Sequence, residues 1–359
     1  MEKMEPHFNL DGLTRMTGAD RPAASQLSLP VIEKQSMQSV QGDCEMENMK
    51  AVRVHNYGGP EVLRFEDAPR PAADAGELLI RVHAVSVNAI DWKARAGYLK
   101  DAFPLPLPYI PGWDVSGSVE AVGSGVANFK KGDEVYARPE GARSGKGTYA
   151  EYVAVKETEA ALKPKSIDHI HAAAIPVVAL TAWQALFDKG GLSKGQKILI
   201  HGAAGGVGSF AVQLAKWKGA YVIGTASGQN QVFLKELGVD EPIDYQKVRF
   251  EDVVQDVDLV LDTLGGDTQN RSWKVLKKGG ILVSIVAPPS ADEAAKHSVR
   301  SVFFAAHPSS SQLSEIAKLV DAGKLKAMVE TVLPLSDARR AHELNETGHA
   351  RGKTVLKVA

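Results

Sequence analysis

Small residues gather where a buried strand is expected to turn into a helix. The segment ILIHGAAGGVGSFAVQLAK places Ala203, Gly205 and Gly208 at the positions of a glycine fingerprint. Residues this small allow a tight turn and a close backbone approach to a pyrophosphate, which the free amides and dipole of the helix start attract. We therefore expect a dinucleotide to contact this loop, including Gly206 and Val207. The alternative is a tight strand-to-helix turn without a ligand.

The following strand, AYVIGTAS, bears on which dinucleotide binds. An NAD site usually has an acid about 20 residues after the glycines, where it accepts a hydrogen bond from the ribose 2′-hydroxyl. Here the strand runs into GTASGQN, which has no acid and offers the Ser227 hydroxyl and the Asn230 amide. These groups favour NADP(H), although the segment has no cation to neutralise a 2′-phosphate. We expect a preference for NADP(H) without strict exclusion of NAD.

The elements around this loop indicate two domains. From Lys50 to about Lys163, short strands are separated by Gly, Pro and Asp, as in a small antiparallel barrel or sandwich. After a helix broken at Pro176, strands alternate with amphipathic helices, among which we place NRSWKVLKKGG; SVFFAAHP is a further expected strand. Such alternation predicts an α/β fold with a doubly wound parallel sheet.

The composition argues against several classes of protein. With 42 Lys and Arg against 43 Asp and Glu, the net charge of -1 gives no attraction to nucleic acid or to an anionic membrane. No segment has the run of about 18 apolar residues that crosses a bilayer. The single cysteine, Cys44, cannot form an intramolecular disulfide, which fits a reducing compartment. Residues 1–48 lack periodicity and are rich in acids, so we expect a disordered extension rather than a transit peptide.

Short motifs follow one another in the order of one enzyme family. They are VSVNAIDWKARAGY, PLPYIPGWDVSGSVEAVG, GDEVYA, TYAEYVAV, IPVVALTAWQAL, HGAAGGVG, IDY, DTLGG and GKTVLKV. On these motifs the chain resembles the medium-chain dehydrogenase/reductase superfamily, in its zinc-independent quinone oxidoreductase and alkenal (enone) reductase branch. The resemblance implies a GroES-like β-barrel domain, a Rossmann domain and an active site between them. The expected ranges are 1–48 for the extension, 49–175 for the GroES-like catalytic domain, 176–306 for the Rossmann NADP-binding domain and 307–359 for the return to the catalytic domain.

The resemblance also locates the positions at which zinc enzymes of the superfamily hold their metal. The ligand cysteine position is Asn88 and the ligand histidine position is Trp113. A catalytic zinc takes three protein ligands, so we expect no metal. Without a Lewis acid, reduction of a simple ketone leaves a developing alkoxide with little help, whereas an enone or a quinone spreads the charge through its own π-system. Enones and quinones are therefore the expected substrates.

Asn88, Asp91 and Lys93 in NAIDWK are the candidate catalytic residues. In the resembling enone reductases, the positions of Asn88 and Lys93 lie beside the nicotinamide and the substrate, and the lysine would hold the cofactor or deliver a proton. The ordinary alternatives are a loop-capping amide, a helix N-terminal cap and a surface lysine. The resemblance places further residues at the cofactor, namely Tyr245, Leu264, Phe304, Ala305 and Lys353, and we expect Trp113 and Tyr98 at the substrate.

Together these observations predict an NADPH-dependent, zinc-free reductase that transfers hydride to quinones or to the C=C bond of α,β-unsaturated carbonyls. One alternative is an enoyl-thioester reductase, including a trans-acting enoyl reductase. The other is a non-enzymatic NADPH-binding protein, crystallin-like or regulatory. We expect a small electrophile as substrate, neither nucleic acid nor membrane as partner, a homodimer and a cytoplasmic location.

Overall fold

The first sheet combines strands from the two ends of the described chain. The computed structural model describes residues 47–102, 104–348 and 351–359, so the expected extension up to residue 46, with Cys44, lies outside the described residues. The sheet has the order β14 (Val329–Pro334), β15 (Lys353–Lys357), β3 (Glu77–Ser86), β4 (Val115–Val122), β5 (Glu134–Ala137) and β7 (Ala160–Leu162), with β6 (Tyr152–Lys156) paired to β3. A separate hairpin consists of β1 (Asn48–Val54) and β2 (Leu63–Pro69).

Alternating side chains explain how this sheet forms its core. In β3, Leu78, Ile80 and Val82 are buried in one apolar cluster, whereas Arg81 between them is exposed. Ile80, Arg81 and Val82 follow the period of two of a strand with one face on the core, whereas Leu79 is buried outside this cluster. Strand β15 pairs antiparallel with β3, and helix α10 (Ala338–Glu346) adds its alanines to the same cluster. The C-terminal segment is thus part of the first sheet.

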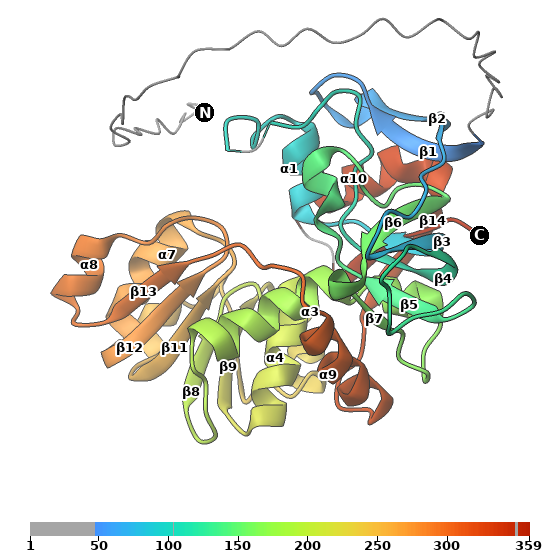
Figure 1. Ribbon diagram of the computed structural model, residues 1–359. Helices are drawn as coiled ribbons and strands as arrows, with labels where there is room; N and C mark the ends of the chain where they lie inside the picture. Colours follow the sequence, from blue (N-terminus) through green and yellow to red (C-terminus); the bar gives the residue numbers. More distant parts are fainter. Residues whose placement is uncertain (1–46, 103, 349–350) are drawn as a thin grey trace, which may run out of the picture. The chain divides into compact units, whose positions relative to one another are not determined.

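The second sheet is parallel throughout its described pairs. Its order is β10 (Glu241–Asp244), β9 (Tyr221–Ala226), β8 (Lys197–Ile200), β11 (Val257–Asp262), β12 (Leu276–Ser284) and β13 (Arg300–Phe303) (Figure 1). The chain runs outward from β8 to β10 and then resumes at β11 on the other side of β8. Ligands of doubly wound sheets bind outside the carboxyl ends of the strands at such a reversal.

Both faces of this sheet are covered, as its nearly continuous apolar strands require. In β8, Ile198 and Ile200 belong to one core cluster and Leu199 to another. The first cluster includes residues of α3 (Pro176–Trp183), α4 (Gly206–Lys218), α5 (Gln231–Glu236) and α9 (Ser310–Asp321). The second includes residues of α6 (Phe250–Val253), the 3-10 helix η6 (Trp273–Val275) and α8 (Ala291–Lys296).

The remaining helices are short. They are α1 (Ala89–Arg95), α2 (His169–Ala173) and α7 (Gly266–Ser272), the π-helix η4 (Gln184–Lys189), and the 3-10 helices η1 (Pro60–Val62), η2 (Glu140–Ser144), η3 (Glu157–Glu159), η5 (Gly228–Asn230) and η7 (Leu335–Asp337).

The fold is α/β with one parallel sheet, as the sequence predicts. The predicted break at Pro176 is present, since α2 ends at Ala173 and α3 begins at the proline. The predicted helix NRSWKVLKKGG is wrong in its second half, because β12 begins at Leu276. Gly279 adopts φ 76°, which a helix does not accommodate, and the β-favouring run ILVS follows directly. The domain ranges 49–175, 176–306 and 307–359 stay predictions.

Gly208 allows α4 to lie close to the loop that follows β8. A Cβ atom at this position would lie 2.2 Å from the Gly202 carbonyl oxygen and 2.7 Å from Ala203 Cα, both of them backbone atoms. We predict that Gly208→Ala lowers the free energy of unfolding by about 2 kcal/mol, because the helix must move away. Urea unfolding measures this loss. Gly205→Ala is the control, since its Cβ would meet only the Gly202 oxygen, at 3.3 Å; equal losses would contradict the packing argument.

Candidate functional site

A buried carboxylate organises the polar side chains at the end of β3. Asp114 Oδ2 accepts hydrogen bonds from Ser86 Oγ at 2.6 Å and from Asn88 Nδ2 at 2.8 Å. Asp114 Oδ1 accepts one from the backbone N–H of Val177, near the start of α3, at 2.7 Å. Asp114 is completely buried, so these donors replace the water that the carboxylate loses.

The cation of this cluster comes from the other end of the chain. Lys353 is 4% exposed, and its Nζ lies 3.5 Å from Asp114 Oδ2. The same ammonium donates to the Val87 carbonyl oxygen at 2.8 Å and makes a short hydrogen bond to Asn88 Oδ1. Burial lowers the pKa of Lys353, while Asp114 and Asp91 act in the opposite direction. Asn88 is therefore held on both sides of its amide, by a carboxylate and by an ammonium.

This cluster lies directly against the glycine loop. Gly352 forms a bridge with Gly205, and its N–H donates to the Ala204 carbonyl oxygen at 3.3 Å. A Cβ atom on Gly206 would lie 3.2 Å from Lys353 Cδ. The polar cluster and the first turn of α4 are thus neighbours, so a ligand on the glycine loop would be close to Asn88.

The glycine loop has the features that a pyrophosphate requires. Gly205 is the N-terminal cap of the 13-residue helix α4 and offers no capping side chain, so the amides of Gly206, Val207 and Gly208 stay available to an anion. Ala203 is buried, and its N–H donates to the Thr225 carbonyl oxygen at 3.0 Å. The predicted residues of this loop are together, and they fit a dinucleotide.

The predicted ribose residues lie at the carboxyl end of β9. Asn230 Nδ2 donates to Ser227 Oγ at 3.1 Å. The Tyr245 N–H donates to the Ala226 carbonyl oxygen at 3.2 Å, while the Tyr245 side chain is 53% exposed. The three predicted residues therefore lie at one edge of the sheet, Ser227 and Asn230 after β9 and Tyr245 after β10, and β9 is the neighbour of β8, which leads into the glycine loop.

Two further loops reach the same edge. Asp262, at the end of β11, is buried and accepts from the backbone N–H groups of Leu264 at 3.0 Å and Gly265 at 2.8 Å. These bonds leave the Leu264 side chain 56% exposed. After β13, the Phe304 N–H donates to the Ser284 carbonyl oxygen at 3.3 Å, and Phe304 is buried whereas Ala305 is exposed. Whether these residues touch a cofactor stays a prediction.

Helix α1 holds Asn88 and Asp91 together and places Lys93 apart from them. Asn88 is its N-terminal cap, and Asp91 accepts from the Asn88 N–H at 2.7 Å within a capping box. Lys93 is half-buried, with its ammonium 5.7 Å from the centroid of the Trp92 ring. The described contacts of Lys93 thus lie outside the Asp114 cluster, and Lys353 is the lysine that touches Asn88. The catalytic role of Lys93 stays a prediction.

The two predicted substrate residues differ in exposure. Trp113 is 3% exposed, and the guanidinium carbons of Arg138 and Arg143 lie 5.5 Å and 6.0 Å from its ring centroid. Tyr98 is 74% exposed and meets the Trp92 ring edge-on, with 6.0 Å between the centroids. Trp113 directly precedes Asp114, so its backbone lies beside the polar cluster.

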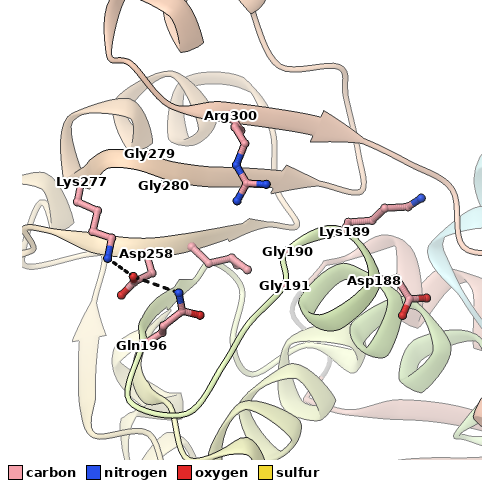
Figure 2. A pocket seen from close by; sticks show the side chains of 11 residues that line it. Asp188, Lys189, Gly190, Gly191, Gln196, Asp258, Lys277, Gly279, Gly280 and Arg300 are labelled. Carbon is pink, nitrogen blue, oxygen red and sulfur yellow. Dashed lines mark hydrogen bonds and ion pairs between the residues drawn. The ribbon is translucent and has the colours of Figure 1, made fainter.

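A polar hollow lies at the opposite edge of the parallel sheet. Its volume is about 460 Å³, and its lining includes the strand starts at Asp258, Lys277 and Arg300. Figure 2 shows Asp258 between Lys277 and Gln196, with Arg300 projecting from β13. Because nucleotides bind at the carboxyl ends of parallel strands, this hollow does not contribute to the site described above.

Neither a metal centre nor a membrane span emerges from residues 47–102, 104–348 and 351–359. Within these ranges, His, Cys, Asp and Glu side chains form no group of three or more that could hold a metal ion. In the same ranges, no helix combines the length and apolar character needed to cross a membrane.

Sequence reasoning missed the residues that organise the site. Asp114, Ser86 and Asp262 were not among the predicted site residues. Ser86 and Asp262 are the last residues of β3 and β11, and Asp114 directly precedes β4. This position is the available signal, because a polar side chain at the end of a buried strand must find a partner. The pairing of Lys353 with Asn88 has no such signal, because 265 residues separate the two in the chain.

The buried Asp91 makes stability depend on pH. Burial raises its pKa to about 7, against a smaller lowering by the Asn88 N–H and Lys353. In the unfolded chain this carboxyl ionises with its ordinary pKa, so the folded protein loses stability as the pH rises from about 4 to 7. We predict that Asp91→Asn becomes more stable relative to the unchanged protein as the pH rises, because an amide keeps the cap without the charge. The difference between their free energies of unfolding should grow by roughly 2 kcal/mol from pH 5 to pH 8.

Denaturant unfolding at the two pH values measures this gain. Burial lowers the pKa of His342 to about 3, which gives an opposite trend, but the trend is shared by both proteins and cancels in their difference. Asp292→Asn, at an exposed acid in the first turn of α8, is the control. A gain that is independent of pH would contradict the assignment to Asp91.

Known proteins resemble the chain over nearly all of its described length. The model of the alcohol dehydrogenase GroES-like domain matches residues 74–165, and that of zinc-binding dehydrogenases matches residues 237–356. The NAD(P)H oxidoreductase RTN4IP1, mitochondrial, of Mus musculus is 38% identical over 86% of this chain and 89% of its own. The NADPH-dependent alkenal/one oxidoreductase, chloroplastic, of Arabidopsis thaliana is 37% identical over 86% of this chain and 80% of its own.

A solved structure agrees with these relatives. The quinone oxidoreductase from Coxiella burnetii superposes with a TM-score of 0.80 and 37% identity, over 87% of this chain and all of that one. The resemblance read from the motifs is confirmed, as are the GroES-like domain and the Rossmann-like parallel sheet. The chain belongs to the medium-chain dehydrogenase/reductase superfamily.

Proposed function

We propose that the protein is an NADPH-dependent reductase of quinones or of the C=C bond of α,β-unsaturated carbonyls. The observation that carries the proposal is the contact between the glycine loop and the buried cluster of Lys353, Asn88 and Asp114. It brings an anion-binding helix start next to a preorganised amide and cation. The relatives include an alkenal/one oxidoreductase and a quinone oxidoreductase, which supports this substrate class.

NADP(H) would be held at the carboxyl edge of the parallel sheet. The first turn of α4 binds the pyrophosphate, and Ser227 with Asn230 binds the adenosine ribose and its phosphate. Tyr245, Leu264, Phe304 and Ala305 complete the predicted contacts. When bound, the nicotinamide supplies the hydride, that is, both electrons of the reduction.

The chain itself stabilises the charge that develops on the substrate. When hydride adds to the β-carbon of an enone, negative charge moves to the carbonyl oxygen, and a proton must then reach the α-carbon. The Asn88 amide is fixed by Asp114 and Lys353, so it costs no reorganisation at the moment of reaction. Lys353 adds a positive field, and Lys93 or water delivers the proton.

The proposal includes a metal-free site. Asn88 is bound to Asp114 and Lys353 through its amide, which does not offer the thiolate or imidazole that catalytic zinc prefers. Trp113, at the other ligand position, would form a wall of the substrate site with Tyr98.

We also propose a homodimer and a cytoplasmic location. Strand β13 is the last of its sheet, and Phe303 on it is 44% exposed, which suits pairing with the same edge of a second copy. Light scattering should give twice the mass of 38.4 kDa. Two relatives carry mitochondrial and chloroplastic in their names, so cell fractionation must decide the location.

A comparison of two lysines on β15 tests the proposed chemistry. We predict that the unchanged protein oxidises NADPH with members of a panel of enones and quinones, and that Lys353→Met lowers kcat about 100-fold, since it removes the cation behind Asn88. Lys357→Met, on the exposed part of the same strand, should keep its kcat. NADPH binding, followed by its fluorescence, should change far less than kcat in Lys353→Met.

The outcomes separate folding from chemistry. Circular dichroism establishes that each variant is folded before its rates are compared. Absence of turnover across the panel by the folded, NADPH-binding protein would refute the reductase activity. A Lys353→Met variant with normal kcat would refute the role of the cluster.

A further inference from the structure

The residues from Ser227 to Asn230, which we call the ribose turn, include no acidic residue. An acidic side chain from another strand nevertheless lies beside this turn. Strands β9 and β10 are parallel neighbours, and Asp244 is paired with Ala226, the residue before Ser227. Asp244 is therefore at the same edge of the sheet as the predicted ribose contacts. It comes from the next strand across the sheet rather than from the end of β9.

The Asp244 carboxylate faces Gly228. A Cβ atom on Gly228 would lie 2.8 Å from Asp244 Oδ2, so the absence of a side chain leaves room for this oxygen. Its other oxygen, Oδ1, accepts from the Gln246 N–H at 3.1 Å, which fixes the carboxylate in this orientation. The Asp244 side chain is 12% exposed. An acceptor is thus held beside the turn formed by Ser227 and Gly228.

The same oxygen faces a cation. Lys247 Nζ lies 3.8 Å from Asp244 Oδ2, and the Lys247 side chain is 79% exposed. An ion pair this long and this exposed contributes little free energy, so a stronger anion can draw the ammonium away. Lys247 can therefore serve a ligand placed beside Asp244 without loss to the fold.

We infer that Asp244 and Lys247 together set the choice between NADP(H) and NAD(H), an inference that rests on the proposed function. Lys247 pairs with the 2′-phosphate of NADP(H), and Ser227 and Asn230 add neutral hydrogen bonds. Asp244 accepts from the 2′-hydroxyl of NAD(H), as an acid at the end of β9 does in other nucleotide sites. The site thus accepts both cofactors, and its preference for NADP(H) depends on Lys247.

Charge balance explains why the two residues act as a pair. A 2′-phosphate next to Asp244 is repelled by the carboxylate unless a cation lies between or beside them. Neutral donors cannot remove that repulsion, whereas the Lys247 ammonium can. Without Lys247, the Asp244 carboxylate should weaken the binding of NADP(H), which carries the 2′-phosphate. The binding of NAD(H), which carries the 2′-hydroxyl, should stay unchanged.

Direct binding tests this without turnover. Calorimetry with 2′,5′-ADP and with 5′-AMP compares two fragments that differ in the 2′-phosphate. Lys247→Met should raise the Kd of 2′,5′-ADP about tenfold and leave that of 5′-AMP unchanged. Asp244→Asn should lower the Kd of 2′,5′-ADP, and it should restore much of the affinity that Lys247→Met loses. In each variant, the Kd of NADPH should change as that of 2′,5′-ADP does, and the Kd of NADH as that of 5′-AMP does, both measured by fluorescence titration.

Two other cations, one on α5 and one packed against it, provide the controls. Lys235 is exposed on α5, and Arg351 lies over the Phe233 ring of the same helix, with 5.3 Å from Cζ to the centroid. Lys235→Met and Arg351→Met should bind both fragments as the unchanged protein does. If Arg351→Met rather than Lys247→Met weakens 2′,5′-ADP, or if Lys247→Met weakens both fragments equally, the inference is overturned. If neither NADPH nor 2′,5′-ADP binds the unchanged protein, the proposed function fails instead.

Discussion

The arrangement of the site depends on one buried ion pair, between Asp114 and Lys353. A carboxylate and an ammonium are both expensive to remove from water, so each must find partners inside the protein. Asp114 binds Ser86, Asn88 and the start of α3, while Lys353 binds Asn88 and the Val87 carbonyl oxygen. The partners come from β3, from α3 and from the last strand. The pair therefore fixes the end of β3, and with it Asn88, relative to the C-terminal strand.

The glycine loop is joined to this pair through a backbone contact. Lys353 follows Gly352, which adopts φ 83° and bridges to Gly205. A Cβ on Gly352 would lie 2.4 Å from the Met328 carbonyl oxygen, so a larger residue would displace the start of β15 from Met328. The geometry that brings the lysine to Asn88 is thus the geometry that brings the strand to the nucleotide loop. The groups proposed for binding and for chemistry thus share one structural element, although they lie far apart in the chain.

Buried polar groups play a similar part beneath the nucleotide edge. Asp262 holds the loop of Leu264 and Gly265, and His201 links Thr225 to Ser272 through its two ring nitrogens, at 3.1 Å and 2.9 Å. Burial lowers the pKa of His201 to about 4, so at neutral pH the ring is uncharged, with one nitrogen donating and the other accepting. It therefore acts as a fixed connector between β9 and the helix after β11. Buried side chains in this way anchor the loops at this edge, among them the loop that carries the exposed Leu264.

The sequence predicts those parts of the molecule that depend on neighbours in the chain. The glycine loop, the break at Pro176 and the order of strands and helices follow from local propensity and period, and all are present. The helix predicted for NRSWKVLKKGG is wrong in its second half, where Gly279 has a positive φ and a β-favouring run follows. The contacts that matter most for the site are of another kind. Asn88 meets Lys353 through sheet pairing, and Asp244 reaches the ribose turn because β10 lies beside β9. A rule that searches for an acid at a fixed distance along the chain cannot find one supplied by the adjacent strand. Since parallel strands end at a common edge, the residues that follow every strand near the glycine loop must be compared before a cofactor preference is read from any one of them.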